Sequence, residues 1–271
     1  MNNAIKLSYV LPDPTSYSDW EEFEGDLVHM KQVGYDAVEL QITDPAAQDE
    51  ARLRRTLDKV GFPLCAMQSG GSYATRGNCL CTANVSVRER TISLLKTFVD
   101  FASRWGAVIV FGSLQGRAKD EPDLEAGRQR IVDAMGLVGR YATEKEVIVA
   151  FEPVNHIEVA YHNSIDSVAE VVRRVNTPGL RMMIDTFHMN IEERDMLKPI
   201  APIRDILAHA HLSETNRDVL GTGHWNTGTF LRELKRVGYA GYCSVGVYNS
   251  RLPRRGCISR CIEVTQRLRK T

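Results

Sequence analysis

The 271-residue sequence predicts an α/β fold in which eight parallel strands, each followed by a helix, close into a (β/α)8 TIM barrel. Short apolar runs alternate with segments of helical periodicity along the chain. Most of these runs are almost continuously apolar, as expected of strands whose two faces are both buried. Glycines stand where helices should end before the next strand. Together, these three observations favour a closed parallel barrel.

Eight runs carry the strand pattern. In chain order they are 5–10 (IKLSYV), 37–42 (AVELQI), 63–69 (PLCAMQS), 107–113 (AVIVFGS), 147–153 (VIVAFEP), 180–189 (LRMMIDTFHM), 206–214 (ILAHAHLSE) and 241–248 (GYCSVGVY). Dividing 271 residues by eight leaves roughly 34 residues for each unit, which is enough for one strand, one helix and their connections.

Amphipathic segments lie between the runs. In the segment 91–105 one helical stripe carries Leu94, Leu95, Phe98, Phe101, Ala102 and Trp105, and in 165–175 a second carries Ile165, Val168, Val171, Val172 and Val175. Gly34, Gly61, Gly106 and Gly238 each precede a strand run. A glycine there indicates the end of a helix, because it adopts positive φ without a clash at Cβ.

We expect residues 1–271 to form a single domain, because no Pro/Gly/Ser-rich linker or shift in composition divides the chain. An open doubly wound sheet is the alternative fold. That fold predicts a glycine-rich phosphate-binding turn after the first strand, and the segment YVLPDPTSY has none.

The balance of charge limits the classes of partner. Thirty-four basic and 34 acidic residues give a formal net charge of zero, which argues against a dominant surface for nucleic acid or for an anionic membrane. The N-terminal residues lack the pattern of a signal peptide, and no apolar run approaches the roughly 18 residues of a membrane span. We therefore expect a cytoplasmic protein without a membrane partner.

Six cysteines occur without the spacing of a strong zinc site. They stand at positions 65, 79, 81, 243, 257 and 261. Buried or incidental thiols in the reduced state are expected in a cytoplasmic chain.

Polar residues gather where the late strands should end. Glu152 ends one run, Asp185 and His188 end the next, and His209, His211 and Glu214 end the third. The gaps of 33 and 26 residues from Glu152 to Asp185 and on to His211 each approximate one strand–helix unit. Alone, such a carboxylate often caps a helix, and such a histidine is often a core residue. Three together at one barrel mouth favour a divalent cation, because burying them unpaired is costly.

Three segments resemble one family of enzymes. FEPVNHIE (151–158), IDTFHMNIEE (184–193) and HLSETNRDVLGTG (211–223) are similar to segments of the D-tagatose 3-epimerase and D-psicose (allulose) 3-epimerase group. This group belongs to the xylose isomerase-like superfamily of TIM-barrel sugar isomerases and epimerases. The likeness covers the C-terminal half of the chain, and the repeating strand–helix pattern extends it to the whole.

The resemblance implies a site and a reaction. It assigns Glu152, Asp185 and His211 as ligands of a divalent metal ion, with Mn²⁺ expected ahead of Mg²⁺, Co²⁺ or Zn²⁺. It makes Glu152 a catalytic residue, and it places Glu158, His188 and Arg217 against a small sugar, either a ketose or a sugar phosphate. In the family mechanism one glutamate removes a proton from C3 to form an enediolate, and a second returns it on the opposite face. A homodimer or homotetramer is also implied, although no surface stripe indicates an interface.

One residue departs from the family pattern. Gly246 stands where the family carries the glutamate of the eighth strand, 35 residues after His211. Its loss removes one metal ligand and one of the two acid/base groups. Four explanations stay open: an impaired or disabled enzyme, a one-base isomerase or lyase, recruitment of Glu39 or Glu214 in its place, or a catalytically silent relative that binds sugar.

Cleavage of phosphodiesters by an AP-endonuclease-like barrel is a further alternative. It requires more histidine ligands on the early strands and a basic groove for DNA. His29 is the only histidine before His156, and the net charge is zero, so we expect no nucleic-acid partner.

Overall fold

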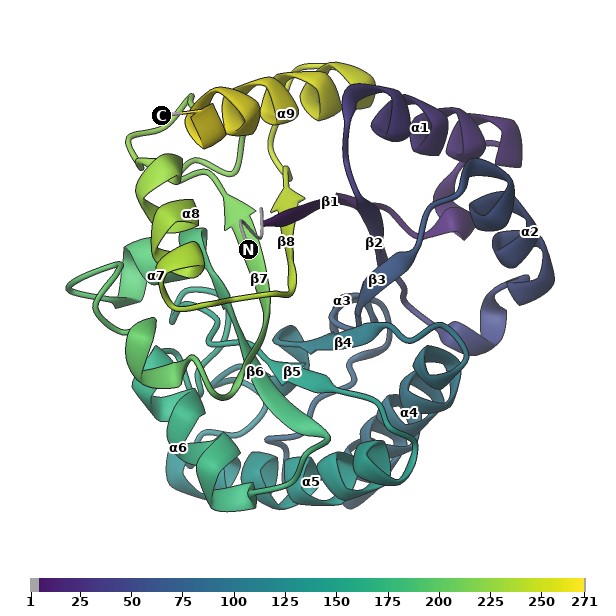
Figure 1. Ribbon diagram of the computed structural model, residues 1–271. Coiled ribbons are helices and arrows are strands. Elements are labelled where there is room, and N and C mark those ends of the chain that lie inside the picture. The colour runs from purple at the N-terminus through teal and green to yellow at the C-terminus, as the bar shows by residue number, and fades with distance from the viewer. Residues whose placement is uncertain (1–4, 271) are drawn as a thin grey trace.

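The computed structural model describes residues 5–270, and within them eight parallel strands form a closed barrel in chain order (Figure 1). The barrel closes where β8 pairs with β1, in a register that places Tyr242 opposite Lys6. The predicted (β/α)8 TIM barrel is therefore confirmed.

The strands and helices alternate as the sequence pattern predicts. The strands are β1 (Lys6–Leu11), β2 (Ala37–Gln41), β3 (Leu64–Gln68), β4 (Val108–Phe111), β5 (Val149–Phe151), β6 (Leu180–Asp185), β7 (Leu207–Ser213) and β8 (Tyr242–Gly246). The helices are α1 (Trp20–Val33), α2 (Glu50–Val60), α3 (Gly71–Arg76), α4 (Val85–Ser103), α5 (Leu124–Glu144), α6 (Ile165–Val175), α7 (Thr186–Glu192), α8 (Thr227–Arg236) and α9 (Arg254–Lys270). Short 3-10 turns occupy Pro14–Ser16, Pro45–Ala47, Ser113–Gln115 and Ala201–Ile203.

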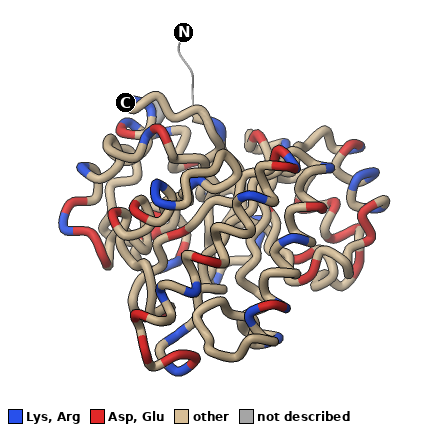
Figure 2. The backbone as a smooth tube through the Cα atoms, turned by 90° about the horizontal axis from the view of Figure 1, so that it is seen from below, with Lys and Arg blue, Asp and Glu red and all other residues tan. Residues whose placement is uncertain are grey.

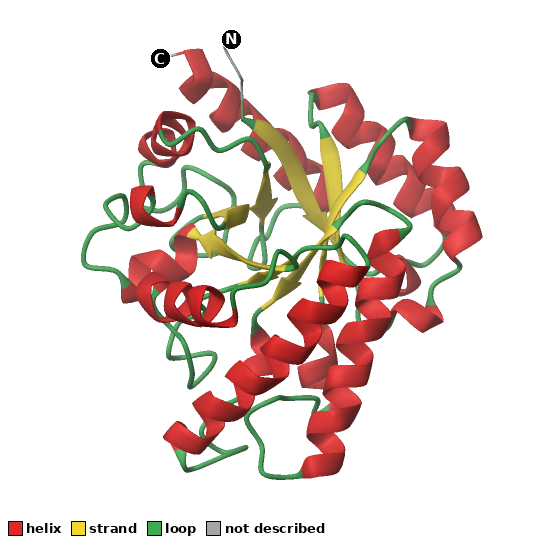
Figure 3. Cartoon of the chain, turned by 60° about the horizontal axis from the view of Figure 1, so that its bottom comes forward, coloured by secondary structure: helices red, strands yellow, loops and turns green. Residues whose placement is uncertain are grey.

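The long helices surround the strands as an outer layer (Figures 1 and 3). Helix α6 has the predicted bounds, whereas α4 begins six residues before the predicted segment and ends two residues before its end. Gly34 ends α1 with φ of 106°, and Gly61 ends α2 with φ of 71°. The predicted helix ends at Gly106 and Gly238 also have positive φ, so all four glycines occupy the left-handed region.

Two sets of buried residues separate the helix-facing and inner sides of the strands. The larger set packs the helices onto the barrel. The smaller set comes from the same strands and consists mainly of small side chains: Ala37, Cys65, Ala66, Val110, Ala150 and Met183. Glu39, Glu152 and Asp185 follow two residues after Ala37, Ala150 and Met183. Because side chains alternate across a strand, these carboxylates share the inner face.

The sixth strand is shorter than the sequence pattern suggests. The apolar run 180–189 predicts one strand, but β6 ends at Asp185 and α7 begins at Thr186. The Asp185 carboxylate accepts a hydrogen bond from the backbone N–H of Phe187 at 2.8 Å, which caps the new helix. His188 therefore extends from a helix at the barrel mouth rather than from the strand.

Acidic and basic residues are interspersed along the tube in Figure 2, in keeping with the zero net charge. Within residues 5–270, no helix combines the length and apolar character needed to cross a membrane.

Candidate metal centre and active site

Three ionisable side chains converge at the carboxyl ends of neighbouring strands. Glu152 directly follows β5, Asp185 ends β6 and His211 lies on β7, and all three are buried. Their potential ligand atoms lie within 4.8 Å of one another. His211 Nδ1 is 3.6 Å from Asp185 Oδ2 and 3.9 Å from Glu152 Oε1. The structure thus brings together the three residues that the sequence assigns to a metal.

The electrostatics of this group favour a bound cation. Burial, followed by the charge of Asp185, raises the pKa of Glu152 to about 8 against the opposing effect of His211. Burial would also raise the pKa of Asp185, but its hydrogen bond to His211 and the charges of His188 and Arg217 hold it below its usual value. Two buried carboxyl groups that repel each other are stabilised together by a positive ion.

The donor set fits a divalent metal ion. Two carboxylates and one imidazole nitrogen form a mixed oxygen and nitrogen set, which suits Mn²⁺, Co²⁺ or Zn²⁺ and accommodates Mg²⁺. Glu39 contacts the Nε2 atom of His211. The Nδ1 atom of the same ring faces the carboxyl groups of Asp185 and Glu152 and is available to a metal ion.

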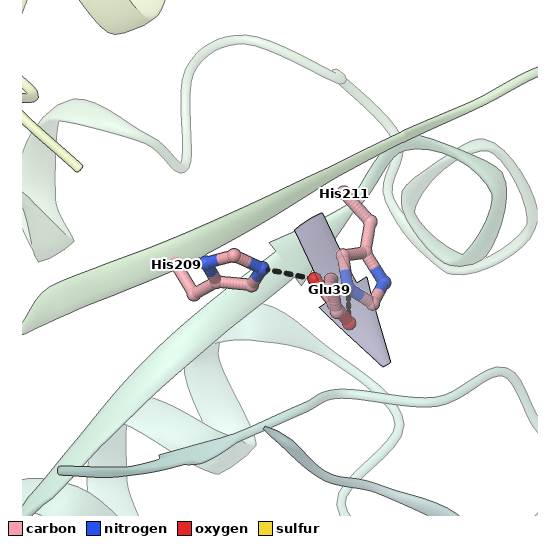
Figure 4. A group of neighbouring side chains, drawn as sticks. All are labelled: Glu39, His209 and His211. Atoms are coloured by element: carbon pink, nitrogen blue, oxygen red, sulfur yellow. Dashed lines mark hydrogen bonds and ion pairs between the residues drawn. The ribbon is translucent and has the colours of Figure 1, made fainter. Parts of the chain in front are cut away.

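A second buried group shares His211. The carboxylate of Glu39, on β2, lies between two imidazole rings of β7, as Figure 4 shows. Glu39 Oε2 is 2.7 Å from Nε2 of His209, and Oε1 is 2.9 Å from Nε2 of His211. The structure therefore places Glu39 in a buried hydrogen-bonded group with the two histidines.

The residues assigned to substrate lie beside the three candidate metal ligands. Arg217 Nη2 is 3.2 Å from Glu158 Oε1 and 3.3 Å from Nε2 of His188. The guanidinium group of Arg217 lies between two rings, 3.9 Å from the centre of Phe187 and 4.8 Å from that of Tyr248. The structure therefore groups Glu158, His188 and Arg217 as the sequence analysis expects.

His188 is held as a neutral hydrogen-bonding group. Burial, opposed by the charge of Asp185 and helped by Arg217, lowers the pKa of His188 to about 4. The backbone N–H of Asn155 donates to Nδ1 of His188 at 3.3 Å, so that nitrogen carries no proton. The proton of the neutral ring is then on Nε2, 3.7 Å from Glu152 Oε1, and the Nη2 atom of Arg217, 3.3 Å from the same nitrogen, makes no hydrogen bond to it.

All six assigned residues line one cavity of about 750 Å³ at the barrel mouth. Amide and hydroxyl side chains from the other loops and strand ends complete its wall: Ser16, Gln41, Thr43, Gln68, Ser113, Asn216, Tyr248 and Asn249. Such a wall offers many hydrogen bonds to a polyhydroxylated ligand.

Comparison with known proteins identifies the family. The family described as "Xylose isomerase-like TIM barrel" matches residues 27–268. The chain belongs to this family. A ketose 3-epimerase of Arthrobacter globiformis is 31% identical over 229 residues, covering 84% of this chain and 78% of the relative. An L-ribulose 3-epimerase of Methylomonas sp. (strain DH-1) is 27% identical and covers 82% of this chain and 77% of the relative.

Solved structures show the same xylose isomerase-like fold. The D-allulose 3-epimerase from Methylomonas sp. in complex with D-allulose superposes with a TM-score of 0.81 at 21% identity, covering 98% of this chain and 99% of the other. A 3-keto-D-glucoside 4-epimerase from E. coli superposes with a TM-score of 0.81 at 17% identity, covering 98% of this chain and 100% of the other. The resemblance inferred from the sequence motifs is confirmed, and the expected isomerase class agrees with relatives named as epimerases.

Gly246 leaves no carboxylate at the end of β8 in this xylose isomerase-like barrel. It pairs in register with Ser213, at the same level as the site. A Cβ atom at position 246 would lie 2.7 Å from Cε2 and 3.1 Å from Oη of Tyr248. The ring of Tyr248 therefore occupies the space into which a side chain at this position would extend.

Neither carboxylate considered as a replacement reaches that space. Both oxygens of Glu39 face histidines of β7. Glu214 is fully buried, and it accepts hydrogen bonds from the backbone N–H groups of Thr215 and Gly221, each at 2.9 Å. Glu214 thus organises the loop that follows β7.

Sequence reasoning missed two residues at the site, Gln68 and Tyr248. Gln68 Nε2 donates to Glu39 Oε1 at 3.0 Å and lies 3.1 Å from the hydroxyl of Tyr248. A polar residue at the end of the apolar run 63–69 was an available signal for Gln68. Nothing in the sequence indicates that the Tyr248 ring would turn toward Gly246.

Proposed function

We propose that this protein is a divalent-metal-dependent ketose isomerase or epimerase that transfers a proton at the sugar carbon next to the carbonyl. The convergence of Glu152, Asp185 and His211 in one polar cavity carries the proposal. These three residues would hold the ion, Mn²⁺ ahead of Mg²⁺, Co²⁺ or Zn²⁺. The bound ion would polarise the carbonyl of the sugar as a Lewis acid.

Glu152 is the proposed proton carrier. Without the ion, burial raises the pKa of Glu152 to about 8, and a bound cation would lower it, so that the ionised carboxylate is available to accept the C3 proton. Removal of the C3 proton leaves an enediolate, and return of the proton from the same carboxyl group restores the original configuration. His188, Arg217 and Glu158 would position the hydroxyl groups of the sugar through hydrogen bonds.

The β8 side of the site sets the expected outcome of the reaction. Inversion at C3 requires a proton donor on the face opposite Glu152, and Gly246 supplies none. The hydroxyl groups nearest to that position belong to Ser213 and Tyr248, each 3.1 Å from a Cβ at residue 246, and both are weak acids. We therefore expect exchange of the C3 proton with solvent to be faster than formation of the epimer.

The test is proton exchange in D₂O with Mn²⁺ or Co²⁺ present, using D-allulose and L-ribulose. Proton NMR follows the loss of the H3 signal and the appearance of the epimer. We expect Glu152→Gln to lower exchange by a factor of about 10²–10⁴, and the exposed Glu144→Gln to leave it unchanged.

A catalytically silent sugar-binding protein is the second candidate, favoured by the loss of the β8 carboxylate at Gly246. Binding of Mn²⁺ and sugar without any exchange at C3 would establish this role and exclude the enzyme. Failure to bind Mn²⁺ would exclude the proposed metal centre altogether.

A further inference from the structure

Glu39 connects two strands that lie apart in the barrel. It is fully buried on β2, whereas its two histidine partners belong to β7, about 170 residues later in the chain. Each carboxylate oxygen faces the Nε2 atom of one ring, at 2.7 Å for His209 and 2.9 Å for His211 (Figure 4). No role in the proposed proton transfer requires Glu39 itself.

The geometry determines where the protons lie. A carboxyl group carries at most one proton, so it cannot donate a hydrogen bond from both oxygens at once. Both contacts can be ordinary hydrogen bonds if Glu39 is ionised. Each of its oxygens then accepts a hydrogen bond from the Nε2–H group of one ring. A cation bound at Nδ1 of His211 takes the place of any proton there, and the one N–H of the neutral ring is then on Nε2, where Glu39 accepts from it.

The other nitrogen of this ring points to the proposed metal centre. Nδ1 of His211 faces Asp185 at 3.6 Å and Glu152 at 3.9 Å. We propose that Glu39 is the positioning residue of the metal centre, which holds His211 as its Nε2–H tautomer with Nδ1 directed at the ion. The inference rests on the proposed function only in requiring that Glu152, Asp185 and His211 hold a cation.

Surrounding side chains keep Glu39 in place. Gln68 Nε2 donates to Glu39 Oε1 at 3.0 Å. On the other side, the hydroxyl of Ser244 lies 3.1 Å from Nε2 of His209, and Ser8 lies 2.6 Å from Ser244. These bonds join β1, β2, β3, β7 and β8, so the orientation of Glu39 is determined by the closed barrel rather than by a loop.

A separate metal site is the competing explanation, because the ligand atoms of Glu39, His209 and His211 also lie within 4.8 Å of one another. The two explanations differ in stoichiometry. A positioning role predicts one Mn²⁺ bound per chain, whereas a second centre predicts two. A second centre also predicts that Glu39→Gln removes one of the two bound ions.

The experiment compares Glu39→Gln with Glu214→Gln, a matched control in which another fully buried glutamate at the barrel mouth is replaced. An amide at position 39 can accept from one ring but must donate to the other, so one histidine must change tautomer. We expect Mn²⁺ affinity, measured by calorimetry, to fall roughly 10- to 100-fold in Glu39→Gln. In Glu214→Gln the affinity should be unchanged, because the hydrogen bonds of the Glu214 carboxylate go to Thr215 and Gly221.

A second measurement follows the tautomer directly. In Zn²⁺-bound protein labelled with ¹⁵N-histidine, two-bond ¹H–¹⁵N spectra should show Nε2–H and unprotonated Nδ1 for His211 in the wild type. His209→Asn leaves the bond between Glu39 and His211 in place, so it should keep that tautomer and most of the Mn²⁺ affinity. This variant also tests the inference if Glu39→Gln does not fold.

Three outcomes would overturn the inference: Nδ1–H at His211 in the Zn²⁺-bound wild type, an unchanged tautomer and affinity in a folded Glu39→Gln, or two Mn²⁺ per chain. Sugar turnover plays no part in these readouts. A protein with the expected tautomer and metal response but without activity on ketoses would contradict the proposed function and leave the role of Glu39 standing.

Discussion

Gly246 leaves the end of β8 without the carboxylate that a second acid/base group at the barrel mouth would require. The register between β7 and β8 extends to the pair of Ser213 and Gly246, so the strand itself would accept a glutamate there. The obstacle is the ring of Tyr248, whose Cε2 atom lies 2.7 Å from the position of a Cβ at residue 246. A glutamate and the present orientation of Tyr248 exclude each other.

We therefore predict that Gly246→Glu alone restores less epimerase activity than Gly246→Glu combined with Tyr248→Ala. In the double variant the carboxylate has room to reach the ion and the sugar. Epimer formation should rise by a factor of about 10²–10⁴, the contribution expected of one acid/base group. Rates of epimer formation from D-allulose measure the effect, with Tyr248→Ala as the control. An equal gain in that control would show that the ring, rather than the missing carboxylate, limits the reaction.

His162 gives a prediction about pH that does not involve the site. It is buried against the edge of Phe151, and its Nε2 has no hydrogen-bond partner within residues 5–270. Burial, followed by the charge of Arg128, lowers its pKa to about 4. The folded protein therefore holds this imidazole neutral at pH values where the unfolded chain, with a pKa of about 6.5, already binds a proton.

The sign follows from the proton count. Between pH 6.5 and 4 the unfolded state binds more protons than the folded state, so the free energy of unfolding falls as the pH falls. The loss from His162 amounts to about 3 kcal/mol by pH 4. We expect His162→Asn, which suits the φ of 43° at this position, to flatten this part of the pH profile. Urea unfolding at several pH values checks it, and parallel profiles for the two proteins would refute it.

At the scale of elements, α5 and β6 approach closely at Gly179. A Cβ at this position would lie 2.5 Å from the carbonyl oxygen of Gly139 and 2.8 Å from the carbonyl carbon of Ala142, both backbone atoms of α5. The carbonyl group of Gly179 also accepts the first hydrogen bond of β5, from Val149 at 2.8 Å. Both neighbours are backbone atoms of a helix, so they cannot turn aside as a flexible side chain would.

We predict that Gly179→Ala lowers the free energy of unfolding by about 1–3 kcal/mol, the usual cost of overpacking a well-filled core. Gly136→Ala, within α5, is the contrasting variant, because its Cβ would meet only the flexible end of Arg140 at 3.4 Å. It should raise stability by about 0.5–1 kcal/mol through helix propensity. Chemical denaturation measures both, and equal effects would contradict the proposed close contact.

At the scale of the whole molecule, the proposed cation and the barrel would stabilise each other. The candidate ligands come from β5, β6 and β7, and Glu39 adds β2 to the same buried group. An ion bound only to the folded state shifts the unfolding equilibrium by mass action.

We predict that Mn²⁺ at 100 times its dissociation constant stabilises the fold by about 2.7 kcal/mol and raises the midpoint of thermal unfolding by about 5 °C. Chelation by EDTA should reverse the shift. Asp185→Asn should abolish it, since it removes a buried anionic ligand from the centre of the group. Differential scanning calorimetry gives the measurement, and an undiminished shift in Asp185→Asn would place the ion elsewhere.

The sequence by itself determined the fold class and the end of the barrel at which the candidate ligands gather. Apolar runs with strand length, amphipathic segments and four glycines with positive φ predict the barrel, because period and backbone freedom act over a few residues. The order of the strands then brings Glu152, Asp185 and His211 to one mouth, since parallel neighbours end on the same side.

Other features were decided only by tertiary structure, because they depend on distances across the barrel. The apolar run 180–189 contains a strand and a helix, and only the cap formed by Asp185 marks the boundary. The approach of Glu39 to two histidines about 170 residues away, and the rotation of Tyr248 into the space beside Gly246, arise from closure of the sheet and side-chain packing. Closure of the sheet and packing of side chains leave no periodic pattern along the chain, so these two contacts could not be predicted from neighbouring residues.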